Sequence, residues 1–281
     1  RIFSLDTSQT PAVLDEKIVL NDANDLLAAE EPSLVEASGL VNLDAEGLAV
    51  SVSGDYWVAS EGRGTVGSNN RPFEFANYLV KADASGAIVD VVSLPDDVEA
   101  LQVRFGFEGV AAVEENGVEV LYVAFQREWA GDPDDLVRIG RYDTATGDWT
   151  FAYYPIEAPT SPNGGWVGLS EISSVGGGEF AVLERDNQAG PDARIKLITS
   201  FSIEDVTFRP NADAPLFDVV AKTVVRDLIA EGDLTDPGGL ILEKVEGLAI
   251  TPNGGAWWLN DNDGVDDSNG ETQFRLIEEL F

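Results

Sequence analysis

The sequence predicts an all-β fold: a β-propeller of four-stranded antiparallel blades. A repeated opening, in which a Glu precedes a short apolar strand, stands at Glu46, Glu108, Glu171 and Glu246. After each opening come a turn with Gly and a second apolar strand that carries an aromatic or branched residue. Repeated units of this kind indicate propeller blades. A sandwich of unrelated hairpins is the alternative, and the fourfold recurrence weighs against it.

Residues 1–20 predict a hairpin, because apolar residues alternate on both sides of a polar turn at Thr7–Thr10. The same pattern of strand, Asp, small polar residues and strand recurs at 78–95 and 138–155 as outer hairpins of the repeat. We therefore expect residues 1–20 to be the outer half of a blade, which implies at least five blades in total. The chain would then be an N-terminally incomplete fragment of one propeller domain, completed by a precursor segment or by a second polypeptide.

Residues 21–45 form a connector with an acidic centre. The first full repeat spans about 46–95 and includes a loop at 62–72, where Gly, Asn and Arg gather. Residues 96–103 predict a short helix on the way to the second repeat. That second repeat spans about 104–156 and contains an insertion at Trp129–Asp135.

The third repeat spans about 166–208, with outer strands expected at Ile195–Ile203 and near Val206–Phe208. In the long insertion that follows, Val219–Ile229 is strongly apolar, and its periodicity leaves strand and short helix open. The fourth repeat spans 245–281, with the segment FRLIEELF as its third strand.

The composition restricts the chemistry. The chain carries 17 basic and 51 acidic residues, a net charge of −34, and lacks Cys and His. Nucleic acids and anionic membranes are therefore poor partners, whereas cations are good ones. Without His or Cys, a Ser-His-Asp triad, a thiolate zinc site and a disulfide are excluded, and an oxygen-rich site favours calcium or magnesium. The acidity is also typical of a protein from a saline or marine source. The sequence holds no run of apolar residues long enough to span a membrane.

The four repeated Glu residues are the candidate catalytic residues. The first strand of a propeller blade lines the central channel, so Glu46, Glu108, Glu171 and Glu246 are expected to converge there. Converging carboxylates repel one another unless a cation, or a basic residue such as Arg104 or Lys244, neutralises them. The alternative is that each Glu accepts backbone hydrogen bonds from a neighbouring blade and acts as a structural latch.

Charged residues also recur where the second strands end. They are Glu61, Arg63, Arg127, Glu128, Arg185 and Asp186. An Arg side chain suits phosphate or carboxylate recognition, so the candidate substrate-binding set is Arg63, Arg104, Arg127, Arg185 and Lys244. The carboxylates of this group, Glu61, Glu128 and Asp186, are candidate metal ligands. Ordinary surface ion pairs are the alternative.

The segment Asn260–Glu271 is rich in Asp and Asn around Gly264. Such a turn can wrap Ca²⁺ with oxygen ligands, although its spacing does not match an EF-hand. The candidate ligands are Asp261, Asp263, Asp266 and Asp267. A solvated acidic turn is the alternative.

These segments together resemble the phytase-like domain family, labelled "esterase-like activity of phytase". The resemblance rests on LDAEGLAV with YWVASEG (43–62), RFGFEGVA (104–111), LYVAFQREWAGDP (121–133), RIGRYDTATGDWTFAYYP (138–155), SPNGGWVGLSEIS (161–173), FAVLERDNQAGPDARIK (180–196) and LEKVEGLAI with NDNDGVDDSNGETQF (242–274). It implies an exported bacterial propeller, extracellular or periplasmic, related in name to calcium-dependent phosphoester hydrolases. Relative to that family, the N-terminal part of the domain is expected to be missing.

The leading functional hypothesis is a secreted, calcium-dependent phosphoester hydrolase that acts on a small anionic substrate. Bound Ca²⁺ would bridge the acidic site and the phosphate, and would lower the pKa of a bound water. Glu246 or Glu171 would serve as general base, and Arg63, Arg127 and Arg185 would hold the phosphate oxygens. Two alternatives remain: a calcium-stabilised binding propeller without catalysis, and a calcium-dependent lactone or carboxyl-ester hydrolase.

Overall fold

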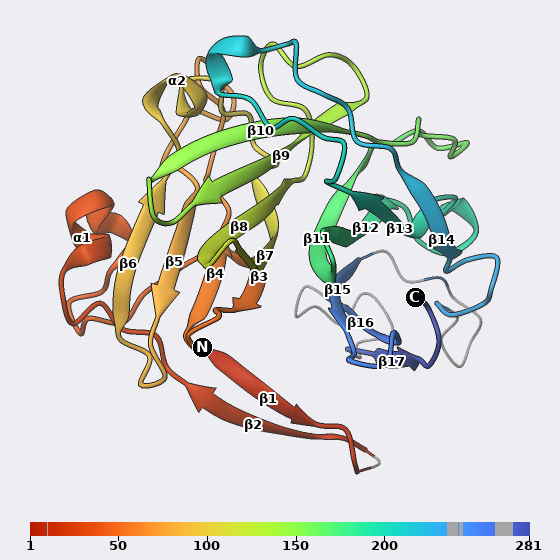
Figure 1. The fold of residues 1–281 in the computed structure, drawn as a ribbon, viewed down its shortest axis with the longest axis horizontal. Coiled ribbons are helices and arrows are strands. Elements are labelled where there is room, and N and C mark those ends of the chain that lie inside the picture. The colour runs from red at the N-terminus through yellow and green to blue at the C-terminus, as the bar shows by residue number, and fades with distance from the viewer. Residues whose placement is uncertain (10, 235–240, 242–243, 262–271) are drawn as a thin grey trace.

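The computed structural model describes residues 1–9, 11–234, 241, 244–261 and 272–281. Its sheets are antiparallel and are arranged as the blades of a β-propeller, which confirms the predicted fold class (Figure 1). Of the described residues, no helix has the length and the apolar character that crossing a membrane requires.

Each blade is a meander in which consecutive strands pair, and the first strand of each is the inner one. The strands are, for blade 1, β3 (Ala45–Val50), β4 (Tyr56–Ser60), β5 (Tyr78–Ala82) and β6 (Ile88–Ser93); for blade 2, β7 (Phe107–Glu115), β8 (Val118–Phe125), β9 (Leu136–Asp143) and β10 (Asp148–Pro155); for blade 3, β11 (Val167–Gly176), β12 (Glu179–Asp186), β13 (Lys196–Ser202) and β14 (Thr223–Asp227); and for blade 4, β15 (Val245–Ile250), β16 (Ala256–Asn260) and β17 (Phe274–Ile277).

The described helices are short and lie in the connections. They are α1 (Leu26–Glu30), η1 (Pro32–Leu34), α2 (Asp96–Glu99), η2 (Gly190–Asp192) and η3 (Asn211–Asp213). The predicted helix at 96–103 is therefore present as α2, which is shorter than the predicted range. The predicted hairpin at 1–20 is also confirmed, as β1 (Ile2–Asp6) paired with β2 (Val13–Ile18).

The core lies between neighbouring blades, and β8 illustrates why its sequence is apolar throughout. Successive side chains of a strand point to opposite faces. Tyr122 and Ala124 pack in a core shared with blade 3, whereas Leu121, Val123 and Phe125 pack in one shared with blade 1. Both faces of the strand are thus covered by protein.

Two glycines allow the inner strands to approach one another closely around the axis. A Cβ atom on Gly47 of β3 would lie 2.8 Å from the Cα of Gly109 in β7. A Cβ atom on Gly109 would in turn lie 2.5 Å from the backbone nitrogen of Ile172 in β11. In blades 1 and 2, the Gly that follows Glu in the repeated opening is therefore required by the spacing of the blades.

The prediction that Val206–Phe208 forms the fourth strand of the third repeat is wrong, because β13 pairs with β14 instead. The intervening segment runs along β10 of blade 2, where Arg209 bridges to Phe151 and Val219 to Tyr153. The ring of Phe217 packs against Phe151 and Tyr153, which covers the outer strand of blade 2. Of the two structures left open for Val219–Ile229, the strand is the one observed.

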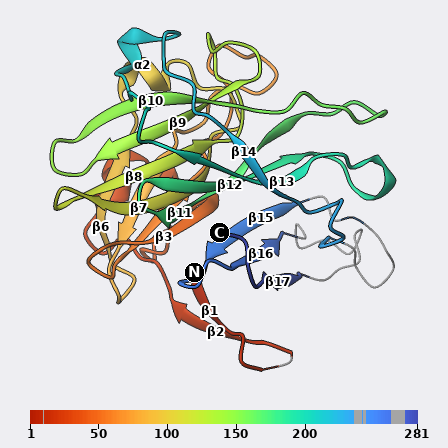
Figure 2. The ribbon, with the colours of Figure 1, turned by 45° about the vertical axis from the view of Figure 1, so that its right-hand side comes forward.

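The hairpin β1–β2 projects from the sheets in two views (Figures 1 and 2). Only its base is packed: Ile2 and Ile18 lie in a small core with Val58 and Ala82 of blade 1. This core anchors the hairpin beneath the first blade.

Candidate active site

A β-bulge interrupts the pairing of the first two strands in every blade. In blades 1, 2 and 4 the unpaired residue is Glu46, Glu108 or Glu246, each preceding the Gly of the repeat. A bulge leaves one residue outside the ladder and redirects its side chain. The three Glu residues therefore occupy equivalent positions, and all three line one cavity.

Blade 3 differs by one residue, which corrects the equivalence expected for Glu171. The bulge residue there is Ser170, and Glu171 stands at the position that Gly47 and Gly109 hold in blades 1 and 2. The side chain of Glu171 is buried, and it accepts hydrogen bonds from the backbone N–H groups of Ile172 (2.9 Å) and Val110. Burial raises its pKa well above the ordinary value. Glu171 therefore makes the latch contact that was the alternative reading, and it lines a separate cavity of about 340 Å³.

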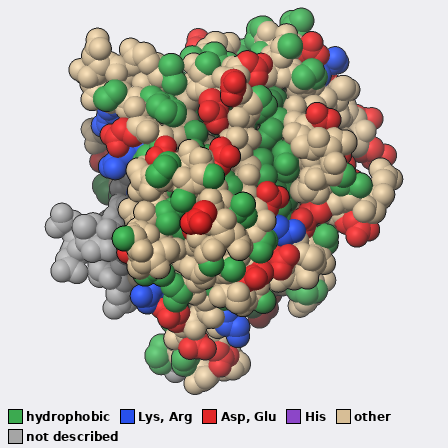
Figure 3. All heavy atoms as spheres, turned by 90° about the vertical axis from the view of Figure 1, so that its left-hand side faces the viewer, with side chains coloured by type: hydrophobic (Ala, Val, Ile, Leu, Met, Phe, Trp, Pro, Cys, Tyr) green, Lys and Arg blue, Asp and Glu red, His purple; other side chains and the backbone are tan. Residues whose placement is uncertain are grey.

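The cavity at the bulges has a volume of about 470 Å³, within the usual range for small-ligand sites. Eight of the residues proposed from the sequence line it: Glu46, Glu61, Arg63, Arg104, Glu108, Arg185, Lys244 and Glu246. Five of the 17 basic residues of the chain contribute to this wall. The face drawn in Figure 3 shows many acidic side chains and few basic ones.

Three carboxylates gather at the blade 1 side of the cavity. Oxygen atoms of Asp44, Glu46 and Glu61 all lie within 4.8 Å of one another. Burial, with the nearby charges of Glu246, Glu61 and Asp44, raises the pKa of Glu46 to about 8. Burial also raises the pKa of Glu61. A hard cation would relieve this repulsion, and carboxylate oxygens are the ligands that Ca²⁺ and Mg²⁺ prefer, so the residues fit such an ion.

Glu108 and Glu246 add two further carboxyl groups to the wall. Burial raises the pKa of Glu108 well above its ordinary value, and the charges of Glu46 and Glu61 add to the effect. Burial also raises the pKa of Glu246, but the positive charges of Arg185 and Lys244 oppose that rise. Of the two, Glu246 is therefore the one whose ionised form is stabilised more by neighbouring positive charge, while burial still keeps its pKa above the ordinary value.

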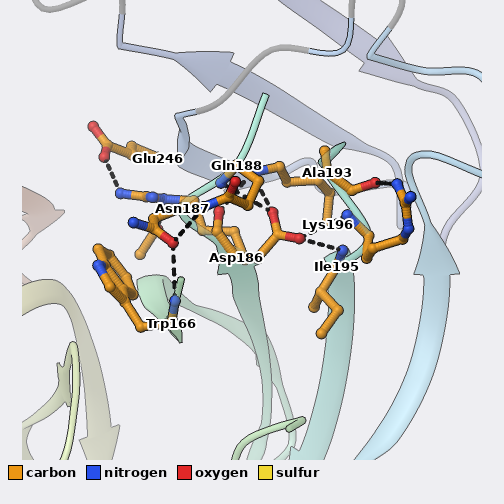
Figure 4. Close-up of polar contacts among 11 residues, drawn as sticks. Trp166, Asp186, Asn187, Gln188, Ala193, Ile195, Lys196 and Glu246 are labelled. Carbon is orange, nitrogen blue, oxygen red and sulfur yellow. Dashed lines mark hydrogen bonds and ion pairs between the residues drawn. The ribbon is translucent and has the colours of Figure 1, made fainter. Parts of the chain in front are cut away.

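Arg185 provides the buried positive charge of the cavity. Its Nε donates to Ser170 Oγ at 2.7 Å, and its NH2 donates to Glu246 Oε1 at 2.5 Å. Glu246 lies with its carboxylate directed toward this contact (Figure 4). Only 3% of Arg185 is exposed, yet its NH1 group has no hydrogen-bond partner within the part of the chain that the structure describes. A buried donor without a partner is costly, so NH1 marks a place for an anionic or polar ligand atom.

Among the described residues, the remaining site residues proposed from the sequence do not line this cavity. Arg127 packs against the rings of Phe105 and Trp166 and pairs with Glu128 at 3.2 Å. Asp186 pairs with Lys196 at 3.0 Å, and Figure 4 shows it directed toward Lys196 and Ile195, away from Glu246.

The calcium loop proposed at Asn260–Glu271 can be followed only at its start. Asp261 Oδ2 lies 3.6 Å from Lys244 Nζ. Asp263, Asp266 and Asp267 lie outside the described residues.

Sequence reasoning missed ten of the residues that line the cavity, among them Asp44, Phe105, Gln126 and Trp166. Asp44 stands two residues before Glu46, and this spacing of two carboxylates was a visible signal. Gln126 directly follows β8, just as Glu61 follows β4, so it could have been found by aligning the strand ends. Phe105 and Trp166 precede inner strands and carry no charge, so a search for ionisable residues passes over them.

Comparisons with known proteins identify a family for this chain. The family model described as "Phytase-like: Esterase-like activity of phytase" matches residues 1–264. A search of curated proteins finds no match. Among solved structures, the crystal structure of a protein of unknown function from Bacteroides caccae is similar, with a TM-score of 0.36 and 12% sequence identity; the match covers 85% of this chain and 80% of that chain.

Proposed function

The chain belongs to the phytase-like family, and from this membership we propose that it is a calcium-dependent hydrolase of a small phosphoester. Family and fold together indicate a phytase-like, esterase-like hydrolase. The observation that carries the finer proposal is one cavity that combines a carboxylate cluster with a buried arginine whose NH1 group has no hydrogen-bond partner among the described residues. A cation site beside an anion site is what a phosphoester requires.

Asp44, Glu46 and Glu61 would hold the cation, which when bound supplies positive charge to activate water and to neutralise the phosphate. Arg185 would bind a phosphate oxygen through NH1, while its contacts with Ser170 and Glu246 keep the guanidinium in place. Arg104 and Lys244 add positive charge to the same wall. This division of roles leaves Glu108 and Glu246 for proton transfer.

In the proposed reaction, a water oxygen attacks phosphorus while the bond from phosphorus to the leaving oxygen breaks. Glu246, which Arg185 and Lys244 favour in its ionised form, accepts the proton of the water. Glu108, which burial keeps protonated, donates its proton to the leaving oxygen. The products are an alcohol and a phosphate. Glu171, the other base considered from the sequence, lies outside this cavity and has no part in these steps.

The test is hydrolysis of a phosphoester panel and a lactone panel, each in EDTA and in millimolar calcium. We expect calcium-dependent turnover of phosphoesters, and about a hundredfold loss or more in the Glu46→Gln and Asp44→Asn variants. Glu204→Gln, at an exposed position, is the control and should retain activity.

Turnover of lactones alone would replace the proposal with a carboxyl-ester hydrolase. If calcium binds and neither panel is hydrolysed, the protein is a binding propeller and the enzymatic proposal fails.

We also propose that the protein is exported by a bacterium, as the family resemblance implies. Extracellular media supply calcium at concentrations that suit weak oxygen-ligand sites. Fractionation of the source cells, followed by detection with an antibody, tests this: recovery in the cytoplasm would contradict it.

A further inference from the structure

Two aromatic rings form part of the cavity wall beside the arginines. Phe105 and Trp166 both line the cavity, and their ring centroids lie 5.2 Å apart at an angle of 53°. The guanidinium of Arg104 lies 4.3 Å from the Phe105 ring centroid, and that of Arg185 lies 5.4 Å from the Trp166 centroid. The buried anion site at Arg185 is thus next to an aromatic surface.

Phe105 is held in a conformation that its residue type disfavours. Its φ angle is 81°, in the left-handed region, where a bulky residue is strained and glycine is the ordinary choice. The backbone is fixed there from both sides: Trp129 Nε1 donates to the carbonyl of Phe105 at 3.2 Å, and the N–H of Gly106 donates to Glu61 at 2.7 Å. A glycine at position 105 would fit this backbone without strain, so an explanation is needed for the ring at this point of the cavity.

Trp166 is also fixed by its backbone. Its N–H donates to Asn187 Oδ1 at 2.9 Å, as Figure 4 shows, and its carbonyl accepts from the N–H of Asn187 at 3.1 Å. The indole is half-buried and stands ahead of β11, on the side of the cavity that carries Arg185. Both rings are therefore pre-positioned, which lowers the entropy that a stacked ligand must lose.

We propose that Phe105 and Trp166 bind a planar aromatic group of the substrate, so that the ester taken by this site is that of an aromatic or nucleobase-bearing alcohol. The inference rests on the proposed function because it concerns the same cavity. A ring on this platform leaves an attached anionic group within the space lined by Arg185. Aromatic and arginine side chains together are a common platform for flat π systems.

The charge of the wall favours one anionic group over several. Counted over the described residues, six acidic side chains line the cavity beside five basic ones. Even with one divalent cation bound, this wall carries too little positive charge to suit a compact polyanion. An aromatic ester with one phosphate fits both the charge and the rings.

The experiment compares two ligands that cannot be hydrolysed and that differ only in the ring: phenylphosphonate and methylphosphonate. Calorimetry in millimolar calcium should give about tenfold tighter binding of phenylphosphonate to the natural protein. In Trp166→Leu this preference should fall below about threefold, while the Kd for methylphosphonate changes by less than about twofold. Trp257→Leu is the matched control, since Trp257 is half-buried in blade 4 and its ring packs at a tilt against that of Phe274; it should change neither Kd.

Equal affinity of the natural protein for both ligands would overturn the inference. So would a Trp166→Leu variant that weakens both ligands equally, because the ring would then serve only to support the arginines. Should Trp166→Leu fail to fold, Phe105→Leu provides the same comparison.

A second experiment compares the binding of adenosine 5′-monophosphate with that of ribose 5-phosphate. Tighter binding of the adenosine compound identifies a nucleoside ester as the substrate. Equal binding of these two, together with a preference for phenylphosphonate, identifies a phenolic ester. The binding measurement does not depend on turnover. If the protein hydrolyses neither panel but still prefers the ligands with a ring, the proposed hydrolysis is contradicted and this inference stands.

Discussion

Glu171 is a carboxyl group kept neutral between two inner strands. Burial raises its pKa well above the ordinary value in the folded protein, although Ile172 and Val110 donate backbone hydrogen bonds to it. Between the ordinary and the raised pKa, the unfolded chain has lost a proton that the folded protein still holds. Stability attributable to this group is therefore complete at low pH and falls as the pH rises through that window.

Glu171→Gln should remove this pH dependence, because an amide oxygen can accept the same hydrogen bonds without ionising. We expect its melting temperature to match the natural protein near about pH 5 and to exceed it by about 2–4 °C near about pH 8. Thermal unfolding followed by circular dichroism measures the difference, with Glu204→Gln as the exposed control. An equal offset at both pH values would show that Glu171 does not titrate as described.

Arg185 differs from an ordinary surface arginine in having one buried nitrogen that no other group in the described part of the chain contacts by a hydrogen bond. Arg185→Lys keeps the charge but loses the planar group that contacts Ser170, Glu246 and a ligand at once. We expect inorganic phosphate to bind about tenfold more weakly to this variant, by calorimetry. Arg209→Lys, in a partly exposed pair that does not line the cavity, should bind phosphate as the natural protein does. Unchanged affinity in Arg185→Lys would remove Arg185 from the anion site.

At the scale of the strands, the inner strands depend on glycine to different degrees. A Cβ atom at position 109 would lie 2.4 Å from Glu171 Oε1 and 2.5 Å from a backbone nitrogen. At Gly247, the equivalent position of blade 4, the nearest atom is a Leu259 side-chain carbon at 3.0 Å. Gly109→Ala should therefore destabilise the protein by about 1–3 kcal/mol, and Gly247→Ala by clearly less. Denaturant unfolding measures both, and equal losses would contradict the unequal approach of the strands.

The strands also show how far sequence reasoning reaches. Hairpins such as β1–β2 and the outer pairs of blades 1 and 2 follow from alternating apolar residues around a polar turn, which are local signals. The path of residues 204–222 does not follow, because it is set by pairing with Phe151 and Tyr153, far away in the sequence. The position of the bulge in blade 3 was missed for another reason. Ser170 and Glu171 are adjacent, and only the pairing register shows which of them leaves the ladder. The sequence could therefore predict a cavity rich in acidic residues and arginine, but it could not predict the full set of residues that line the cavity.

For the whole molecule, a net charge of −34 implies repulsion that the folded state must overcome. Sodium chloride should raise the melting temperature by screening this repulsion. Calcium at the same ionic strength should raise it further, because binding to the Asp44, Glu46 and Glu61 cluster stabilises only the folded state. We expect the additional rise to be about 2–4 °C for each kcal/mol of linked binding, and Glu46→Gln to abolish it while leaving the sodium effect intact. Identical melting curves in the two salts would argue against a specific site.

The serine bulge of blade 3 has a consequence for how a guest molecule can sit at the axis. A wall that repeated one carboxylate in each blade would look nearly the same after rotation from blade to blade, and a guest could bind in several rotated poses. Ser170 removes the acid from one blade, and Arg185 places a cation there. The rotational equivalence is lost, so that a guest with one negative end has a single favoured pose. A one-residue offset in one strand of a repetitive fold thus gives a site that binds its ligand in one orientation.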